Sequence, residues 1–391
     1  MVLSGGGDLR GPLPEVPMHS SSPGDRASTP APGPLPAELQ DAVAAMMRAG
    51  HVPGLSLAVT DRDGLLCAAG FGLADLAGRV PATPGTAYPW FSMTKPVTAT
   101  AVMALAEAGR LDLQSPVDEH LDFPPAPGGA RPTVEQLLTH TAGLSNPLPI
   151  RWVHPAGAPP PPAGDLLRRL MRRRRAYRYP VGERARYSNV GYLALGEVLE
   201  AVTGTSFESS LRETVLGPAG MTRTGFARPQ GAVAATGYLR APRLADPMLR
   251  LLLPRGVAGS RTGAHLGLRP FHVDGPAFGG LMGDVLDAAR FLRLHLGEGQ
   301  IDGRRVLSAD AARSMRTIAH PGRPFDHGIG WFRRPAPGAH EWVEHYGTGA
   351  GFWNVMRLYP DRGLGIVMMT NSTTAYDFGP VLARLAAAPW A

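Results

Sequence analysis

Ser92 and Lys95 are the two residues of this sequence whose types and spacing could most readily perform covalent chemistry. Residues three apart on the first turn of a helix share a face, so the hydroxyl and the amine can meet. A serine hydroxyl is a weak nucleophile until a neighbouring base takes its proton. A lysine amine can be that base when burial and nearby cations disfavour its charged form. The pair therefore predicts a nucleophilic serine.

Lys95 is the only lysine among 391 residues, so the other 38 of the 39 basic residues are arginines. An arginine guanidinium does not lose its proton in proteins and cannot serve as a neutral amine. A mechanism that requires a neutral amine would explain the single lysine. The alternative is a surface lysine, because S-x-x-K is a short pattern.

Two later tripeptides could complete a site. In Y-S-N (187–189), the Tyr187 phenol beside a cation could relay protons, and the Asn189 amide could bind a substrate carbonyl. H-Y-G (345–347) ends a strand-like segment, and the glycines there and just beyond let the backbone approach a ligand closely. Taken alone, Tyr187 is typical of a core or turn aromatic, and His345 of a hydrogen-bonded structural histidine.

Together, S-M-T-K, Y-S-N and H-Y-G resemble, in type and order, the motifs of the serine β-lactamase and penicillin-binding-protein superfamily. The pattern is most similar to the branch that holds class C β-lactamases, D-alanyl-D-alanine carboxypeptidases and β-lactamase-like esterases. The resemblance spans about residues 38–388 and includes "LLTHTAGL" (137–144), "YSNVGYLALGEVLEAVTG" (187–204), "VLGPAGMTRTGF" (215–226), "GGLMGDVLDAARF" (279–291) and "GIGW" (328–331).

The resemblance implies a role for each residue of the motifs. Ser92 would attack a carbonyl and form an acyl-enzyme, and Lys95 would take or share its proton. Tyr187 would relay a proton to the leaving group and then help to activate water. Asn189 would hold a polar group of the substrate.

The third motif would complete the substrate-binding residues. The backbone N–H groups of Ser92 and Thr348, the residue after Gly347, would form an oxyanion hole. His345 would line the opposite wall. β-Lactamases carry K-T-G at this place, whereas this chain has histidine and the bulky Tyr346, which we expect to alter the wall. A fixed cation for a drug carboxylate is therefore weakened, which argues against a β-lactamase.

The pattern of elements predicts an α/β (α+β) fold, and the resemblance implies that this fold is β-lactamase/transpeptidase-like. We expect a helix over 36–50 capped by Gly50, two strands around a turn at 61–64, a helix over 97–111, and strands with a closing helix in the last 65 residues. Both chain ends would share one mostly antiparallel sheet, flanked by helices, with a helical domain inserted.

The expected domain boundaries follow from that arrangement. Residues 1–35, rich in Gly, Pro and Ser, are predicted to be a disordered tail. Residues 36–388 are expected to form a single catalytic unit, in which 36–111 and 326–388 build the α/β sheet domain and 112–325 the helical domain.

Composition argues against a membrane-spanning, secreted, disulfide-bonded or metal-binding protein. No apolar run approaches the ~18 residues that a membrane span needs, and the N-terminus has no apolar signal segment, so a cytoplasmic protein is predicted. Cys67 is the only cysteine, which excludes an internal disulfide and a multi-thiolate metal site. His340 and His345 are five apart in a strand-like context and do not fit the helical zinc motif, so we expect no metal or other cofactor.

Three further features have structural interpretations. His140 in "LLTHTAGL" is expected to help wall the site rather than act as a base. Asp284 and Asp287 are expected at a helix start. Nine arginines crowd into 168–186 and localise the excess charge of a chain with net charge +7. They could form a solvated helix, a rim that favours acidic substrates, or an anion-binding surface.

The sequence therefore predicts a serine hydrolase that acts through an acyl-enzyme, most simply a carboxylesterase on small esters. A D,D-peptidase or amidase, a weak β-lactamase and an acyltransferase stay open on the same machinery. An anion-binding protein that acts through 168–186 is the alternative of another class. No nucleic-acid partner is expected, and the oligomeric state is open. The shape of the substrate pocket would come from loops around 145–165 and 228–275. Their sequences contain no motif that identifies the substrate.

Overall fold

The computed structural model describes residues 32–147, 152–173, 175–334, 342–373 and 377–390. Most of the expected tail (1–35) lies outside the described residues. Within 32–35, the Gly33 N–H donates to the Leu66 carbonyl (3.0 Å) and Leu35 is buried. None of the helices in these ranges is long and apolar enough to cross a bilayer.

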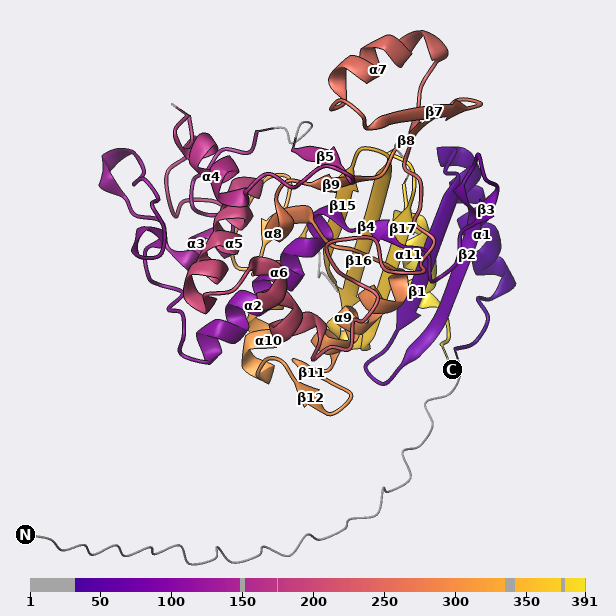
Figure 1. Ribbon diagram of the computed structural model, residues 1–391. Helices are drawn as coiled ribbons and strands as arrows, with labels where there is room; N and C mark the ends of the chain where they lie inside the picture. Colours follow the sequence, from indigo (N-terminus) through magenta and orange to yellow (C-terminus); the bar gives the residue numbers. More distant parts are fainter. Residues whose placement is uncertain (1–31, 148–151, 174, 335–341, 374–376, 391) are drawn as a thin grey trace, which may run out of the picture. The chain divides into compact units, whose positions relative to one another are not determined.

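One antiparallel sheet is built from both ends of the chain, as predicted (Figure 1). Its strand order is β13-β14-β15-β16-β17-β1-β2-β3. The N-terminal strand β1 pairs directly with the C-terminal strand β17, with Leu57 opposite Met368. The strands are β1 (Gly54–Thr60), β2 (Leu65–Asp75), β3 (Val80–Pro81), β13 (Asp326–His327), β14 (Phe332–Arg333), β15 (Val343–Gly349), β16 (Phe352–Tyr359) and β17 (Leu364–Thr370).

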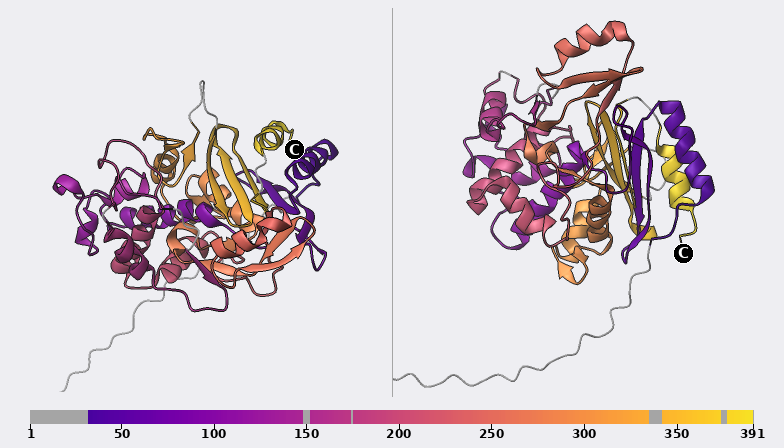
Figure 2. Two further views of the ribbon diagram at one scale, coloured as in Figure 1. Left: turned by 90° about the horizontal axis from the view of Figure 1, so that it is seen from above. Right: turned by 45° about the vertical axis from the view of Figure 1, so that its right-hand side comes forward.

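Helices cover both faces of this sheet (Figures 1 and 2), so every residue of β1 and β17 is buried. On one face α1 (Ala37–Gly50) packs beside α11 (Gly379–Ala387), and on the other α9 (Val285–Leu296) packs against β1, β16 and β17. The expected cap at Gly50 is one residue off. Gly50 is the last helical residue, and His51 takes the left-handed cap conformation (φ 49°, ψ 41°).

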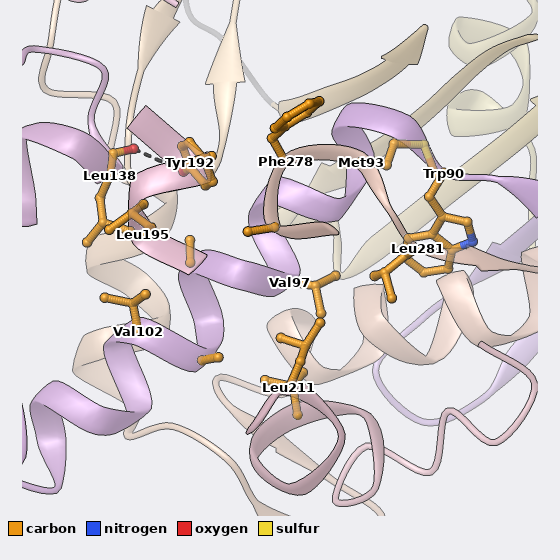
Figure 3. Packing of buried hydrophobic residues seen from close by; sticks show 14 of the residues in the cluster. Trp90, Met93, Val97, Val102, Leu138, Tyr192, Leu195, Leu211, Phe278 and Leu281 are labelled. Atoms are coloured by element: carbon orange, nitrogen blue, oxygen red, sulfur yellow. Dashed lines mark hydrogen bonds between the residues drawn. The ribbon is translucent and has the colours of Figure 1, made fainter. Parts of the chain in front are cut away.

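The remaining helices surround α2 (Thr94–Glu107), which is buried along most of its length. Val97 and Val102 of α2 lie among apolar side chains of α5, α6 and the segment around α8, including Leu195 and Leu211 (Figure 3). These helices are α3 (Val134–Leu138), α4 (Ala163–Met171), α5 (Asn189–Thr203), α6 (Phe207–Leu211), α8 (Pro276–Gly279) and α10 (Ala309–Arg316). The division into 36–111 with 326–388 and 112–325 stays a prediction, and both α2 and α9 pack across it.

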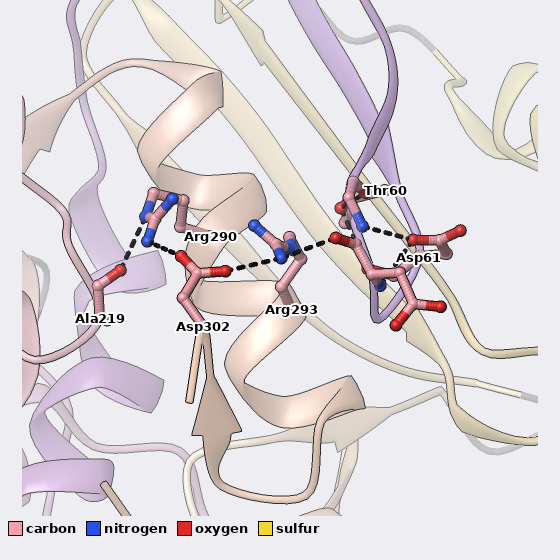
Figure 4. A network of polar contacts seen from close by, with 8 residues as sticks. Thr60, Asp61, Ala219, Arg290, Arg293 and Asp302 are labelled. Carbon is pink, nitrogen blue, oxygen red and sulfur yellow. Dashed lines mark hydrogen bonds and ion pairs between the residues drawn. The ribbon is translucent and has the colours of Figure 1, made fainter. Parts of the chain in front are cut away.

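Two arginines of α9 fix that helix to its neighbours (Figure 4). Arg290 Nε donates to the Ala219 carbonyl (2.7 Å), and its guanidinium also pairs with Asp302. Arg293 donates to Asp302 Oδ1 (3.0 Å) and to the Asp63 carbonyl in the β1–β2 turn (2.9 Å). Asp302 lies in the turn between β11 (Gln300–Ile301) and β12 (Arg304–Arg305), so this hairpin, α9 and the β1–β2 turn are held together.

Several short strands have no clear signal in the sequence. A three-stranded sheet contains β6 (Tyr238–Arg240), β8 (His265–Leu268) and β7 (Ala258–Thr262), with α7 (Asp246–Leu252) inserted between β6 and β7. Two strand pairs lie near the site described below: β4 (Tyr88–Pro89) with β10 (Met282–Gly283), and β5 (Val153–Pro155) with β9 (Phe271–Val273).

Candidate active site

Ser92 lies in a tight 3-10 turn, Phe91–Met93, that leads directly into α2. Phe91 adopts a positive φ of 47°, a strained conformation for a residue with a side chain. Its ring is packed between Phe271 (centroids 6.2 Å apart) and Phe352 (5.9 Å), and this packing can hold the strain. The turn leaves Ser92 partly exposed while Lys95, on the first turn of α2, is fully buried.

Lys95 Nζ has three polar partners. It lies 2.9 Å from Ser92 Oγ, 2.8 Å from Asn189 Oδ1 and 2.9 Å from the Phe278 carbonyl oxygen. A neutral amine has two N–H donors and one lone pair. The amide oxygen and the carbonyl oxygen can only accept, so they take both donors. The lone pair of a neutral Lys95 must therefore face Ser92 Oγ, the one partner that can donate a proton.

Burial favours this neutral form. The Lys95 side chain is 0% exposed, and desolvation lowers its pKa well below the ordinary range of a lysine. Two aromatic rings favour the charged form instead, because an ammonium is attracted to the face of a ring. Nζ lies 4.9 Å from the ring centroid of Tyr187 and 5.3 Å from that of Phe278. Cation–π attraction supplies about 0.5–2 kcal/mol, whereas desolvating an ion costs several kcal/mol, so desolvation prevails.

Tyr187 lies just before α5, and its phenol interacts with the Ser92 side chain. Burial raises the pKa of the Tyr187 phenol well above its ordinary value, so it keeps its proton at neutral pH. His140 holds this tyrosine in place. Its ring lies 4.6 Å from that of Tyr187, and its Nδ1 accepts the Ser188 backbone N–H (3.1 Å). In the sequence, the "LLTHTAGL" stretch had indicated that His140 helps to form the wall of the site.

His345 is buried behind Tyr187, with ring centroids 6.1 Å apart, and is not among the residues that line the cavity beside Ser92. Its Nδ1–H donates to the Tyr346 carbonyl (2.8 Å), which leaves Nε2 as the acceptor. Burial lowers the pKa of His345 well below its ordinary value. It therefore supplies no fixed cation at neutral pH.

The expectation that Tyr346 alters the wall of the site is wrong. Side chains alternate along a strand, so Tyr346 points to the opposite face of the sheet from His345. There its ring lies 5.5 Å from that of Phe378, and its hydroxyl donates to Glu344, which also pairs with the buried Arg357 (2.6 Å).

Gly347 and Gly349 allow β15 to run directly against the turn that carries Ser92. A Cβ atom at Gly347 would lie 2.0 Å from the Trp90 carbonyl oxygen, and one at Gly349 would lie 2.1 Å from the Phe91 ring. Only glycine permits these approaches. As a result, Thr348 and Ser92 line the same cavity.

That cavity has a volume of about 330 Å³. Ser92, Asn189 and Thr348 contribute polar groups, and none of the described residues that line it carries a charge. The loops around 145–165 and 228–275 do shape it, as expected. The other lining residues are Phe91, Trp152, Val153, Leu253, Val257, Phe271, Val273, Phe278, Gly279, Gly349, Ala350 and Thr373.

Comparison with known proteins agrees with this architecture. The family model described as Beta-lactamase matches residues 39–388. The chain belongs to the β-lactamase family. Protein Rv1367c of Mycobacterium tuberculosis is 32% identical over 297 residues, which cover 69% of this chain and 68% of that protein. Penicillin-binding protein 4 of Amycolatopsis lactamdurans is 27% identical over 362 residues, covering 88% and 87% of the two chains.

Among solved structures, the octameric penicillin-binding protein homologue from Pyrococcus abyssi is similar, with a TM-score of 0.75 and 26% identity. The alignment covers 89% of this chain and 76% of that one. The family resemblance and the fold class predicted from the motifs are both confirmed. The chain has the serine-hydrolase fold of its β-lactamase family.

In this β-lactamase family member, the acidic residues that the sequence placed at a helix start stabilise that helix start. Asp284 caps α9 by accepting the N–H groups of Leu286 (3.1 Å) and Asp287 (3.0 Å). Asp287 in turn accepts the Arg223 N–H (2.7 Å). Within the described ranges, no three His, Cys, Asp or Glu side chains gather as metal ligands. His340 lies outside those ranges.

The arginine run 168–186 does not form one helix in this family member. Helix α4 ends at Met171, and it buries Leu166, Leu167, Leu170 and Met171 while Arg168 and Arg169 are exposed. Beyond the helix the described arginines are also exposed, apart from the half-buried Arg186, which lies 4.7 Å from the Tyr179 ring centroid. None of the described arginines of the run lines the cavity.

Proposed function

We propose that this protein is a serine hydrolase that forms an acyl-enzyme on Ser92 and acts on small esters with an apolar acyl group. The observation that carries the proposal is the uncharged, largely apolar cavity that includes Ser92. An apolar cavity of this size suits the hydrocarbon part of an ester, which gains ~0.8 kcal/mol for each CH₂ group removed from water.

In the acylation step, the neutral Lys95 amine accepts the Ser92 proton as Oγ bonds to the ester carbonyl carbon. The backbone N–H groups of Ser92 and Thr348 donate to the oxyanion that develops, which is usually a large catalytic contribution. The C–O bond to the leaving alcohol then breaks. Tyr187, whose ring centroid lies 4.9 Å from Lys95 Nζ, donates its phenol proton to that oxygen and regains one from the Lys95 ammonium.

Deacylation reverses these proton movements. Water loses a proton through the Tyr187–Lys95 pair as it attacks the acyl carbon, and Ser92 Oγ recovers a proton as it leaves. Asn189 takes part in both steps by positioning. Its Oδ1 is engaged by Lys95 (2.8 Å), and its amide NH₂ can donate to a polar group of the substrate.

Charge favours an ester over a D,D-peptide or a β-lactam. Both of those substrates carry a carboxylate, which is costly to bury without a partner. His345 is buried and neutral, Tyr346 points to the other face of the sheet, and the described lining residues are uncharged.

The test compares p-nitrophenyl acyl esters of several chain lengths, a chromogenic cephalosporin and a D-Ala-D-Ala peptide. We expect ester turnover that is lost in Ser92→Ala and retained in Ser260→Ala, a matched control at an exposed serine on β7. Preferential turnover of the cephalosporin or the peptide would overturn the choice of substrate. Ester turnover that survives in Ser92→Ala would overturn the nucleophile.

A further inference from the structure

Helix α7 and the short 3-10 turn that leads into it (Arg243–Ala245) present an exposed apolar surface, named here the α7 surface. It consists of Leu244, Met248, Leu251 and Leu252, which are 95%, 57%, 76% and 47% exposed. These are four of the six large hydrophobic residues that are exposed in the described part of the chain, and they fall within nine positions. No residue of α7 is buried. So dense an exposed apolar group marks a contact with something else.

The same segment is strongly basic. Residues 238–262 contain five arginines and one acidic residue, Asp246. Asp246 is already paired, because Arg261 Nε donates to its Oδ2 (3.0 Å) and a second guanidinium nitrogen contacts Oδ1. The four remaining arginines are exposed: Arg240, Arg243, Arg250 and Arg255. The α7 surface is therefore flanked by about four uncompensated positive charges.

The surface stands away from the rest of the described chain but is connected to the cavity. In Figure 1 and the right-hand view of Figure 2, α7 projects beyond the helices and the main sheet on the small sheet of β6, β7 and β8. Arg250 ties it to β7 by donating to the Gly259 carbonyl (3.0 Å). Leu253, the first residue after α7, and Val257, four positions further on, line the cavity beside Ser92.

Charge decides among the possible occupants of this surface. A second copy of the chain would bring two sets of like charges together, which disfavours self-association. An anionic lipid surface satisfies both features, because leucines can enter the acyl boundary while arginines meet phosphate head groups. We propose that the α7 surface docks the protein on anionic lipid interfaces.

Docking would place the mouth of the cavity near that interface. Together with the proposed function, this suggests that the ester substrates are amphiphiles presented at a lipid surface. The docking itself does not depend on catalysis, so the two claims can fail separately.

The experiment measures partition of the full chain onto vesicles of phosphatidylglycerol and phosphatidylcholine, with pure phosphatidylcholine for comparison. We expect binding to the anionic vesicles that weakens as salt is raised. Leu244→Ser with Leu251→Ser should weaken it at least about tenfold, because both side chains lose apolar burial. Arg243→Gln with Arg255→Gln should weaken it by roughly fivefold for each arginine and reduce the salt dependence.

Two controls keep the outcomes separate. Arg172→Gln with Arg175→Gln removes the same charge from the 168–186 run and should leave partition unchanged. Ser92→Ala should bind vesicles like the wild type, so loss of esterase activity cannot imitate loss of docking.

The proposal is overturned if the leucine variant binds the anionic vesicles as the wild type does, or if the Arg172 and Arg175 control weakens binding equally. It is also overturned if the leucine variant dissociates an oligomer in solution without changing vesicle binding, since a second copy would then cover the surface.

Discussion

Replacing Lys95 by methionine removes the amine but keeps an unbranched side chain of similar length. Loss of a positioned general base costs 10²–10⁴-fold, so we expect kcat/KM for p-nitrophenyl esters to fall by about 10³-fold, or ~4 kcal/mol of transition-state stabilisation. Two acceptors lose their donor in this variant, Asn189 Oδ1 and the Phe278 carbonyl. Each unpaired buried acceptor costs ~1–3 kcal/mol of folding free energy, which is partly offset because a desolvated amine is no longer buried.

Lys95→Arg tests the neutral-amine argument itself, since it retains a cation but cannot supply a free base. We expect it to be as inactive as the methionine variant. Stopped-flow measurement of the p-nitrophenolate burst reports acylation alone, and circular dichroism with thermal unfolding checks that each variant is folded. In Lys95→Ala, ethylamine added to the buffer should restore part of the burst. A folded Lys95→Arg or Lys95→Met enzyme with activity within tenfold of the wild type would refute the reasoning.

Three further predictions concern the site and its pH dependence. Gly347→Ala should lose most ester turnover, because its Cβ would lie 2.0 Å from the carbonyl oxygen of Trp90, the residue before the turn that carries Ser92. Gly157→Ala, with open space around it, should be neutral in the same assay. Trp152→Ala should shift the preference in the p-nitrophenyl series toward longer acyl chains, because a ring that lines the cavity is removed, and an unchanged chain-length profile would argue against this acyl site. Burial lowers the pKa values of His295 and His327 to about 3, from 6.5 for the free side chain. Between pH 3 and 6.5 these histidines are therefore protonated only in the unfolded state. Because protons bind the unfolded state in this range, the free energy of unfolding falls as the pH falls. Each histidine contributes about 1.4 kcal/mol per pH unit to the slope of the unfolding free energy against pH. Urea titrations at several pH values should show that one such contribution is missing in His295→Leu. An unchanged slope in that variant would contradict the lowered pKa of His295.

Residues close in sequence were the predictable part of the site. Ser92 and Lys95 are three apart, so helix periodicity alone brings them together. Tyr187 and Asn189 became candidates through the resemblance of their motif, and the structure places both against Lys95. The third partner of Lys95 was out of reach, because the Phe278 carbonyl is a backbone group 183 residues away and no side-chain type reports its position.

The fold also has parts that could be predicted from the sequence and parts that could not. The hairpin of β1 and β2 could be predicted because its turn has a clear chemical signature, in which Asp61 Oδ1 accepts the N–H groups of Asp63 (2.8 Å) and Gly64 (2.7 Å). The segment 238–268 could not, because its strands are only three to five residues long and the leucines of α7 face solvent rather than a core. Tyr346 was misplaced because a single motif does not reveal which face of a strand meets the site.

The protonation state of Lys95 is the most direct test of the central claim. Because the chain has one lysine, labelling lysine with ¹³C and ¹⁵N yields a single side-chain signal that needs no assignment. The structure predicts the chemical shift of a neutral amine at the pH of turnover, and a titration midpoint well below the ordinary lysine value. An ammonium signal that persists through the active range and titrates like an exposed lysine would contradict the proposed role of Lys95 as the base for Ser92.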